Sequence, residues 1–560
     1  MPLQAQRRPV ESPNGMVASA HALASQIGVD CLRQGGNAVD AAVATGLALS
    51  VVYPRAGNLG GGGFLLIRLA DGRTTLIDFR ETAPAAATRT MFQDAQGNVV
   101  ADRSTVGYLA SGVPGTVAGF ALAWEKYGSG KLSWSQLVEP ARQLAEKGFV
   151  VSPYFAQDLR ASRDLLGKNA ESTRVYLNGG KLFAAGDRFV QPDLAATLRR
   201  LQERGSREFY EGETARLIAE DMQAHGGLVR RDDLKSYRAV ERAPLHGSYR
   251  GFEVIAPPPP SSGGVALLQI LGMIEPYDVA AMGTNSAAKI HLFTEAMRRA
   301  FRDRAEYLGD PDFVRVPVAG LLEPKYLKTR MADFDPEKAT PSASLPAGSP
   351  LSGESHETTH YSVVDAAGNA ASCTYTLNGL YGSGVTAAGT GVLLNNEMDD
   401  FTAKVGVKNL YGLMQGESNA VAPGKRPLSS MTPTIVLKNH APFLVTGSPG
   451  GPTIITTTLF VVTNVIDHSM SVTQAVDAPR FHHQWQPDVV NYEPFFTSQD
   501  TMALLRAKGH VLQPRKLYPN DPDAAARYWG DAESILIDPK TQLRQGANDP
   551  RNPESTVAGY

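Results

Sequence analysis

The chain has 560 residues, of which 42% are hydrophobic and 20% charged, and its formal net charge is −2. This composition is that of a folded globular protein too long for one ordinary core, and no block of like charge favours nucleic acid or an anionic membrane surface as a partner. No apolar stretch reaches the ~18 residues that a membrane-spanning helix needs.

The N-terminal part is predicted to form two helices. Residues 1–15 are polar and lack the apolar core of a signal peptide, which predicts a cytoplasmic protein or one whose secretion signal was removed or never included. Met16–Gln34 has helical spacing of Ala and Leu and ends at Gly35 and Gly36. Asn37 can cap a second helix that runs to about Val51.

A glycine cluster follows, with five glycines between residues 57 and 63. A phosphate-binding loop would follow a strand, precede a helix and contain Gly-Lys-Ser/Thr, whereas this cluster follows a helix and precedes strand-like runs at Phe64–Leu69 and Thr74–Phe79. We therefore expect a tight turn at which backbone segments approach closely.

The middle of the chain, residues 110–330, is predicted to be mainly helical, with a Pro- and Gly-rich break at residues 256–264. Helices are expected at Gln136–Lys147, Pro192–Arg204 and Ser286–Tyr307. From residue 333 to 357 the composition turns to Pro, Ala, Ser and Gly, which cannot bury a core and predicts a mobile tract. A boundary is expected at its end, before Thr358.

The two cysteines, Cys31 and Cys373, are the only ones in the chain. A bridge between them stays open at this stage. Two small buried apolar side chains are the favoured interpretation.

The segment from His356 to His360 is consistent with two kinds of enzyme that exclude each other. It spells H-E-x-x-H, the zinc-protease signature, which needs both histidines on one face of a helix. However, the β-branched threonines lead into an extended run to Val364, a turn-like segment, and a second extended run at 370–376, which indicates a β-hairpin. On a strand the two histidines would lie roughly 13 Å apart, at ~3.3 Å per residue. The metalloprotease alternative is therefore disfavoured, and no metal or other cofactor is expected.

A threonine at the start of such a strand can carry chemistry of another kind. If the Glu357–Thr358 bond were cut, the new α-amine of Thr358 could take the proton of its own hydroxyl, directly or through a water. An α-amine has a reference pKa near 7.7–8.0, so a good fraction is neutral at physiological pH. This chemistry needs no side-chain base, and the chain has no G-x-S-x-G nucleophile elbow.

A second catalytic element is predicted downstream. An apolar strand around 443–445 runs into Gly447–Pro452, and an apolar helix follows from about Thr453 to Ile466. Gly450 and Gly451 thus occupy a strand-to-helix turn, where backbone N–H groups point outward at the positive end of the helix dipole. This is the physical requirement for an oxyanion hole.

Several separated motifs together resemble the γ-glutamyltransferase (glutathione hydrolase) family of N-terminal-nucleophile hydrolases. The similarity spans roughly residues 14–560 and keeps the family's order. The motifs are Asp78-Phe79-Arg80-Glu81-Thr82-Ala83-Pro84, Ser111-Gly112-Val113-Pro114-Gly115-Thr116-Val117, Thr358-Thr359-His360-Tyr361-Ser362, Asn395-Asn396-Glu397-Met398-Asp399-Asp400-Phe401, Pro427-Leu428-Ser429-Ser430-Met431 and Gly447-Ser448-Pro449-Gly450-Gly451.

The resemblance implies an α+β fold, an αββα four-layer sandwich formed jointly by two subunits of one precursor. Residues 1–357 would be the large subunit and 358–560 the small catalytic one, with cleavage between Glu357 and Thr358. The implied site residues are Thr358 as nucleophile, Thr376 as the hydroxyl that hydrogen-bonds it, Gly450 and Gly451 as oxyanion-hole amides, Arg80, Ser429 and Ser430 for the substrate α-carboxylate, Asn378, Glu397 and Asp400 for its α-ammonium, and Tyr411 in a substrate lid.

The implied activity is transfer of a γ-glutamyl group from glutathione or another γ-glutamyl compound to water, an amino acid or a peptide. A glutaryl-type cephalosporin acylase of the same fold is the nearest alternative, although Glu397 and Asp400 argue for a substrate ammonium. Glu397 stands where some relatives carry glutamine. A non-catalytic binding module is a further, less favoured alternative. The family usually works in the periplasm or outside the cell, so this location is expected alongside the cytoplasmic one.

Overall fold

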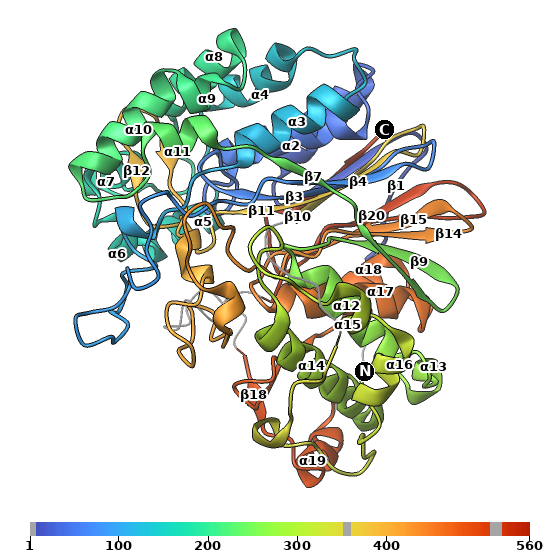
Figure 1. Cartoon of the computed structure of the whole chain (residues 1–560). Coiled ribbons are helices and arrows are strands. Elements are labelled where there is room, and N and C mark those ends of the chain that lie inside the picture. The colour runs from blue at the N-terminus through green and yellow to red at the C-terminus, as the bar shows by residue number, and fades with distance from the viewer. Residues whose placement is uncertain (1–6, 351–359, 516–528) are drawn as a thin grey trace.

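Two seven-stranded sheets lie face to face at the centre of the computed structural model, which describes residues 7–350, 360–515 and 529–560 (Figure 1). The first sheet has the order β21 (Thr556–Gly559), β2 (Met16–Ser19), β10 (His360–Val364), β11 (Ala370–Thr376), β3 (Gly62–Arg68), β4 (Thr74–Asp78), β7 (Val240–Arg242). The second has the order β1 (Val10–Ser12), β20 (Arg544–Ala547), β19 (Ser534–Ile537), β15 (Ala441–Thr446), β14 (Thr434–Lys438), β9 (Phe252–Ala256), β8 (Leu245–Tyr249).

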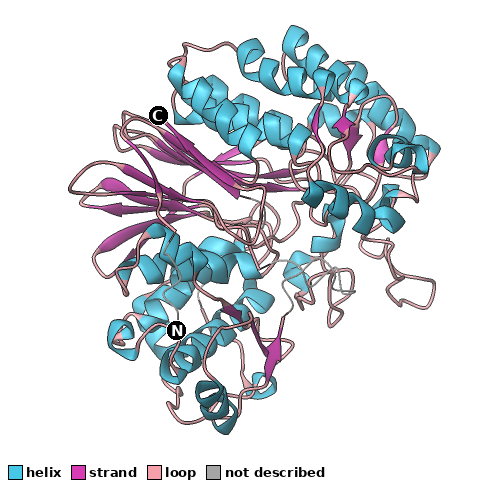
Figure 2. Ribbon diagram, turned by 180° about the vertical axis from the view of Figure 1, so that it is seen from behind, coloured by secondary structure: helices cyan, strands magenta, loops and turns pink. Residues whose placement is uncertain are grey.

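Helices cover the outer face of each sheet, as Figure 2 shows from behind. Over the first sheet lie α1 (Ala22–Arg33), α2 (Ala38–Val52) and α3 (Thr116–Tyr127), with α4 (Trp134–Lys147) packed on α2. Over the second lie α12 (Ser262–Ile274), α17 (Thr453–Ile466) and α18 (Val472–Asp477), with α14 (Ala287–Tyr307) packed on α12. The four-layer αββα architecture expected from the sequence is confirmed.

Further helices extend both layers. Those beside the first sheet are α5 (Pro153–Ala161), α6 (Arg163–Leu166), α7 (Ala170–Tyr176), α8 (Pro192–Arg204), α9 (Glu208–Glu211), α10 (Glu213–Ala224) and α11 (Arg231–Ser236). Those beside the second are α13 (Val279–Met282), α15 (Val318–Leu321), α16 (Pro324–Arg330) and α19 (Gln499–Ala507). Within the described residues, no helix is both long and apolar enough to traverse a bilayer.

Strand β3 is buried on both faces, which explains why its residues 64–67 are continuously apolar rather than alternating. On β3, Phe64 and Leu66 belong to the core between the two sheets, whereas Leu65 and Ile67 belong to the core under the helices. Side chains of the second sheet, such as Ile435, complete the inter-sheet core. This burial fixes the register of the first sheet, because a one-residue slip would exchange the two faces.

Most element predictions are confirmed, including α4, α8, α14 and the strand pair β3–β4. Asn37 forms a capping box with Asp40 at the start of α2. The helix predicted from Met16 is wrong at its beginning: residues 16–19 form strand β2, and α1 begins only at Ala22. The reason is tertiary, because β2 pairs with both β10 and β21.

The glycine cluster allows close contact between backbones, as the sequence predicts. A Cβ on Gly61 would lie 1.8 Å from the carbonyl oxygen of Thr376, and one on Gly63 would lie 2.3 Å from that of Thr374. Both distances are sterically impossible, so β3 can pair with β11 at this point only without side chains. Cys31 and Cys373 are both free and buried.

Residues 333–350, for which the composition predicts mobility, pack beside α14. Ser342 is buried; its backbone N–H donates to Asp488 Oδ2 at 2.7 Å, and its carbonyl accepts from Trp485 Nε1 at 2.9 Å. The backbone N–H of Thr340 donates to Glu295 Oε1 at 3.1 Å. Polar contacts rather than an apolar core hold this segment, which is why hydrophobicity gave no signal for it. The rest of the tract, 351–357, lies outside the described residues.

Candidate active site

A cavity of about 510 Å³ opens where β11 ends beside the turn between β15 and α17. Five of the residues implicated by sequence line it: Thr376, Asn378, Tyr411, Gly450 and Gly451. Thr376 is the last residue of β11, and its Oγ1 accepts a hydrogen bond from the backbone N–H of Asn378 at 2.8 Å. The cavity therefore gathers residues from three separate segments of the chain.

The glycine turn has the geometry that the sequence predicts. Gly450 and Gly451 have φ of 129° and 57°, in the region that favours glycine, and α17 begins at Thr453. Among the described residues neither glycine N–H finds an acceptor, so both can serve a ligand. A Cβ on Gly451 would lie 2.7 Å from Cδ1 of Tyr411, so the tyrosine ring covers this turn closely. Two free amides at a helix start suit a developing oxyanion.

Tyr411 is held over the cavity by the loop that contains it. Its hydroxyl donates to the carbonyl of Asn378 at 2.8 Å, and its backbone N–H donates to Asn409 Oδ1 at 3.1 Å. Asn409 Nδ2 in turn donates to Asp400 Oδ1 at 3.2 Å. This chain of contacts connects the cavity wall to the charged groups behind it.

Arg80 is the centre of those charged groups and is 0% exposed. It lies two residues beyond the end of β4, and its guanidinium donates to Asp400 Oδ2 at 2.7 Å and to Glu397 Oε1. Glu397 and Asp400 come from a single 3₁₀ turn, Glu397–Asp400. The fork of Arg80 thus pairs with two carboxylates at once, in the geometry that favours arginine over lysine.

Glu81 is a third carboxylate in this cluster, and the sequence analysis assigned it no role. Its Oε2 lies 3.8 Å from Arg80 Nη1, and neither of its oxygens receives a hydrogen bond from a donor in the described residues. Burial raises the pKa of Glu81 to about 7, and it raises the pKa of Glu397 well above its usual range, although Arg80 opposes both shifts. The two side chains are within hydrogen-bond reach of each other, which requires a proton between them.

Ser429 and Ser430 lie next to the same cluster. Arg80 donates to the carbonyls of Pro427 and Leu428, immediately before them, at 3.4 and 3.3 Å. Both serines are fully buried, and Ser430 Oγ makes no hydrogen bond within the described part of the chain. A buried hydroxyl without a partner is available for a ligand oxygen.

Glu357 and Thr358 lie outside the described residues. Their nearest described neighbour is His360, the first residue of β10, whose Nδ1 lies 3.1 Å from Thr374 Oγ1 and whose Nε2 lies 2.8 Å from Ser362 Oγ. His360 therefore lies on a strand with both ring nitrogens engaged. This contradicts the metalloprotease alternative, which requires a helix here.

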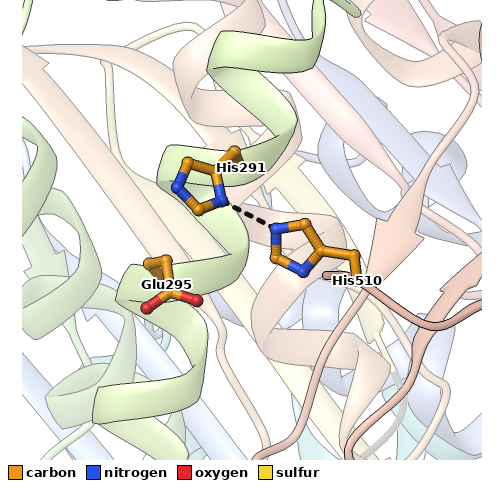
Figure 3. Close-up of side chains that lie close together, drawn as sticks. All are labelled: His291, Glu295 and His510. Carbon is orange, nitrogen blue, oxygen red and sulfur yellow. Dashed lines mark hydrogen bonds between the residues drawn. The ribbon is translucent and has the colours of Figure 1, made fainter. Parts of the chain in front are cut away.

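A different group, His291, Glu295 and His510, brings metal-ligating atoms within 4.8 Å of one another (Figure 3). His291 Nδ1 and His510 Nε2 lie 2.7 Å apart and share a hydrogen bond. Glu295 accepts from Arg298 at 3.2 Å and from Arg299 at 2.6 Å. Since the facing ring nitrogens and the carboxylate are already engaged and two guanidinium groups adjoin them, we interpret this group as a hydrogen-bonded link in the packing of α14.

Two further positioning residues escaped the sequence analysis although they lie inside a motif quoted there. Asn395 donates from Nδ2 to the carbonyls of Gly60 and Gly112 at 2.8 and 3.0 Å, which ties the 3₁₀ turn to the glycine cluster. Asp399 accepts from Ser104 Oγ at 2.7 Å and from the backbone N–H of Leu410 at 2.8 Å. Burial raises its pKa to about 6. Their sequence position next to Glu397 and Asp400 is the feature from which a role in the site could have been predicted.

The four layers, the β10–β11 hairpin and the adjoining glycine turn before α17 define the class: an αββα hydrolase of the N-terminal-nucleophile type. Residues 24–559 match the family model described as Gamma-glutamyltranspeptidase. The chain is 50% identical to the glutathione hydrolase proenzyme of Escherichia coli over 99% of its length and 93% of that protein. It is 40% identical to the acylase ACY 1 proenzyme of Pseudomonas sp. (strain SE83) over 91% of its length and 89% of that protein.

Among solved structures, the cephalosporin acylase of Bacillus halodurans superposes with a TM-score of 0.87 at 28% identity, covering 100% of this chain and 98% of the other. The family model spans nearly the whole sequence. The chain therefore belongs to the gamma-glutamyltranspeptidase family of enzymes.

Proposed function

We propose that the chain is a precursor that cuts itself before Thr358 and then works as a γ-glutamyl hydrolase and transferase. The observation that carries the proposal is the buried cluster of Arg80 with Glu397 and Asp400 behind a cavity lined by Gly450 and Gly451, whose N–H groups find no acceptor among the described residues. A γ-glutamyl group bears an α-carboxylate and an α-ammonium, and both charges need fixed partners when they leave water. Arg80 with Ser429 and Ser430 suits the carboxylate, and Glu397, Asp400 and Asn378 suit the ammonium.

Self-cleavage is an acyl shift followed by hydrolysis. The hydroxyl of Thr358 attacks the carbonyl carbon of Glu357, the C–N bond breaks, and the departing amine takes up the proton that the hydroxyl gave up. Water then hydrolyses the resulting ester, which leaves a carboxylate on Glu357 and restores the Thr358 hydroxyl. The spacing of residues supports Thr376 as the hydroxyl that acts with Thr358. Thr376 follows Thr374, the partner of His360 in the β10–β11 pair, by two residues, and Thr358 precedes His360 in the sequence by two residues.

Turnover repeats the same chemistry on a substrate. The α-amine of Thr358 takes the hydroxyl proton, the oxygen attacks the γ-carbonyl, and the amides of Gly450 and Gly451 stabilise the oxyanion, a contribution of roughly 3–4 kcal/mol per donor. The leaving amine departs with the proton and a γ-glutamyl ester remains. Water or the amine of an amino acid or peptide then attacks this ester and regenerates Thr358.

The experiment is a denaturing gel of the purified protein. Wild type should give two fragments, one from each side of residue 357, and Thr358→Ala should give one uncut, inactive chain. An uncut wild-type chain with full activity would rule the mechanism out.

A glutaryl acylase is the second candidate, because the acylase superposition covers the whole chain. A glutaryl group has no α-ammonium, so it brings no further cation to Glu397 and Asp400, which Arg80 already contacts. Comparing γ-glutamyl and glutaryl anilides separates the two candidates: we expect kcat/KM at least about a hundredfold higher for the γ-glutamyl compound, since an incompletely compensated buried charge costs several kcal/mol. A periplasmic or secreted location stays a prediction from the family.

A further inference from the structure

The segment Trp529–Ser534 lies between the oxyanion turn and strand β10. The backbone N–H of Asp531 donates to Ser448 Oγ at 2.9 Å, two residues before Gly450. On its other side, Ser362 Oγ in β10 donates to the carbonyl of Glu533 at 2.7 Å. A Cβ on Gly450 would lie 3.1 Å from the backbone nitrogen of Gly530, so the segment and the turn are in direct contact. The segment therefore touches both elements that the chemistry needs.

Two carboxylates from this segment are buried beside each other without enough donors. Asp531 is 2% and Glu533 0% exposed. Asp531 Oδ2 accepts from Asn552 Nδ2 at 2.6 Å, but Asp531 Oδ1 and both oxygens of Glu533 receive no hydrogen bond from a donor in the described ranges. The two side chains are within hydrogen-bond reach of each other. Two carboxylate oxygens can make that contact only if one of them carries a proton.

The surrounding cations are already paired with other carboxylates. Arg480 donates to Asp549 Oδ2 at 2.6 Å, and Arg551 pairs with Asp549 and Glu493. Other charged or titratable groups near the pair are Arg7, which is bonded to Asp477, and His360 on β10, whose pKa burial lowers to about 3. Arg55, which is paired with Asp158, and Tyr154 line a cavity together with Asp531. None of these cations within the described residues forms an ion pair with Asp531 or Glu533. Burial raises the pKa of Asp531 to about 7 and that of Glu533 well above its usual range.

We propose that Asp531 and Glu533 hold one proton between them at neutral pH, and that this protonated pair positions the oxyanion turn. The carboxylic acid of Glu533 donates to the carboxylate of Asp531, and the pair keeps residues 529–534 in contact with Ser448 and Ser362. Loss of the proton places two like charges together at a site where the described cations already have other partners, and the repulsion moves the segment away from the turn. The positioning role rests on the proposed function, whereas the shared proton does not.

The test is thermal unfolding of full-length Glu533→Gln between pH 6 and 10, because the glutamine amide can donate to Asp531 without a proton that titrates. A carboxyl group whose pKa is higher in the folded than in the unfolded protein makes its full contribution to stability below the unfolded pKa. The folded protein loses this stability as pH rises toward the folded pKa. The Tm of wild type should therefore fall relative to the Tm of Glu533→Gln as pH rises, so that the difference between the two Tm values increases with pH.

The matched control is Glu493→Gln, a buried glutamate from the same region that accepts from Arg551 at 2.6 Å. This variant loses an ion pair and should melt below wild type throughout the range. If Glu533→Gln behaves like Glu493→Gln, or if its Tm follows pH with the wild-type slope, the shared proton is overturned.

The positioning role has a separate readout in the pH profile of kcat. With a γ-glutamyl anilide, Glu533→Gln should match wild type near pH 7 and exceed it about threefold or more at pH 9.5, because rising pH favours ionisation of the wild-type pair. If kcat of wild type and of Glu533→Gln changes equally with pH on the alkaline side, the positioning role is refuted. The melting experiment tests the shared proton whichever substrate the enzyme uses. The shared proton and the proposed function can therefore fail independently.

Discussion

The Arg80 cluster and the Asp531–Glu533 pair are both groups of buried carboxylates, yet they are neutralised differently. Around Arg80, three carboxylates surround one guanidinium that contacts two of them directly. Among the described residues the Asp531–Glu533 pair has no such cation, and it is left with Asn552 and a proton. In the Arg80 cluster the proton between Glu81 and Glu397 can give way to a second, mobile cation, because the fixed guanidinium compensates the remaining charge. A pair without a fixed cation depends on its proton and suits a structural role.

Removing the guanidinium should have the largest effect, because it abolishes the difference between the two groups. In Arg80→Met, three buried carboxylates lose their cation and the substrate carboxylate loses its partner. We expect kcat/KM to fall by about a thousandfold or more, since an uncompensated buried charge costs 3–5 kcal/mol. Steady-state kinetics with a γ-glutamyl anilide measures it.

Arg68→Met is the control for Arg80→Met, because Arg68 is also buried but donates to the backbone carbonyls of Gly368 and His440 instead of carboxylates. It should keep most of the activity. Wild-type kcat/KM in Arg80→Met would contradict the assigned role.

Asp400→Asn should have the next largest effect. The amide keeps the size of the side chain but removes one charge from the ammonium side, so KM for γ-glutamyl substrates should rise about a hundredfold, whereas glutaryl substrates should be affected little. The ratio of kcat/KM for the two anilides measures the change directly. Equal losses for both substrates would show that Asp400 supports the fold and does not select the ammonium.

The pH dependence of substrate binding sharpens the comparison further. The proton between Glu81 and Glu397 competes with the substrate ammonium, and the pKa of Glu81 lies at about 7. KM should therefore rise as pH falls below 7, approaching tenfold per unit, and Glu81→Gln should flatten this dependence. KM measured from pH 5.5 to 8.5 tests it, with Glu241→Gln, a change near the surface on β7, as the control. A flat wild-type profile would contradict the shared proton at this site.

The smallest effect is expected for Asp531→Asn combined with Glu533→Gln at pH 7. Two amides can reproduce the hydrogen bond that the acid pair makes, so we expect the free energy of unfolding to change by less than about 1 kcal/mol. Chemical denaturation measures it. A loss of several kcal/mol would mean that the charge of this pair, rather than its hydrogen bond, holds the segment.

Sequence patterns predicted the parts of the fold whose signals are local. Asn37 as a helix cap, the glycine cluster as a close backbone approach, and Gly450 and Gly451 at a strand-to-helix turn are all confirmed. Strand β2 was missed because Met16–Ser19 is a strand only through its pairing with β10 and β21. Pairing partners hundreds of residues away leave no trace in a short window.

The charged site was harder to predict than the glycine turn. The resemblance supplied Arg80, Glu397 and Asp400, but their direct pairing depends on how the end of β4 meets the 3₁₀ turn at 397–400. The role of Glu81 was missed for the same reason, since nothing in the sequence tells whether a glutamate beside Arg80 points inward. The Asp531–Glu533 pair gave no signal at all, because two acids two residues apart are ordinary on a surface.

The account depends most on Thr358 becoming a chain terminus. The direct measurement is the N-terminal sequence of the smaller fragment in a preparation whose active sites have been counted by a γ-glutamyl burst. We predict that the fragment begins Thr358-Thr359-His360 and that its molar amount equals the number of active sites. A fully active preparation in which Thr358 is still joined to Glu357, or in which the fragment begins at another residue, would contradict the account.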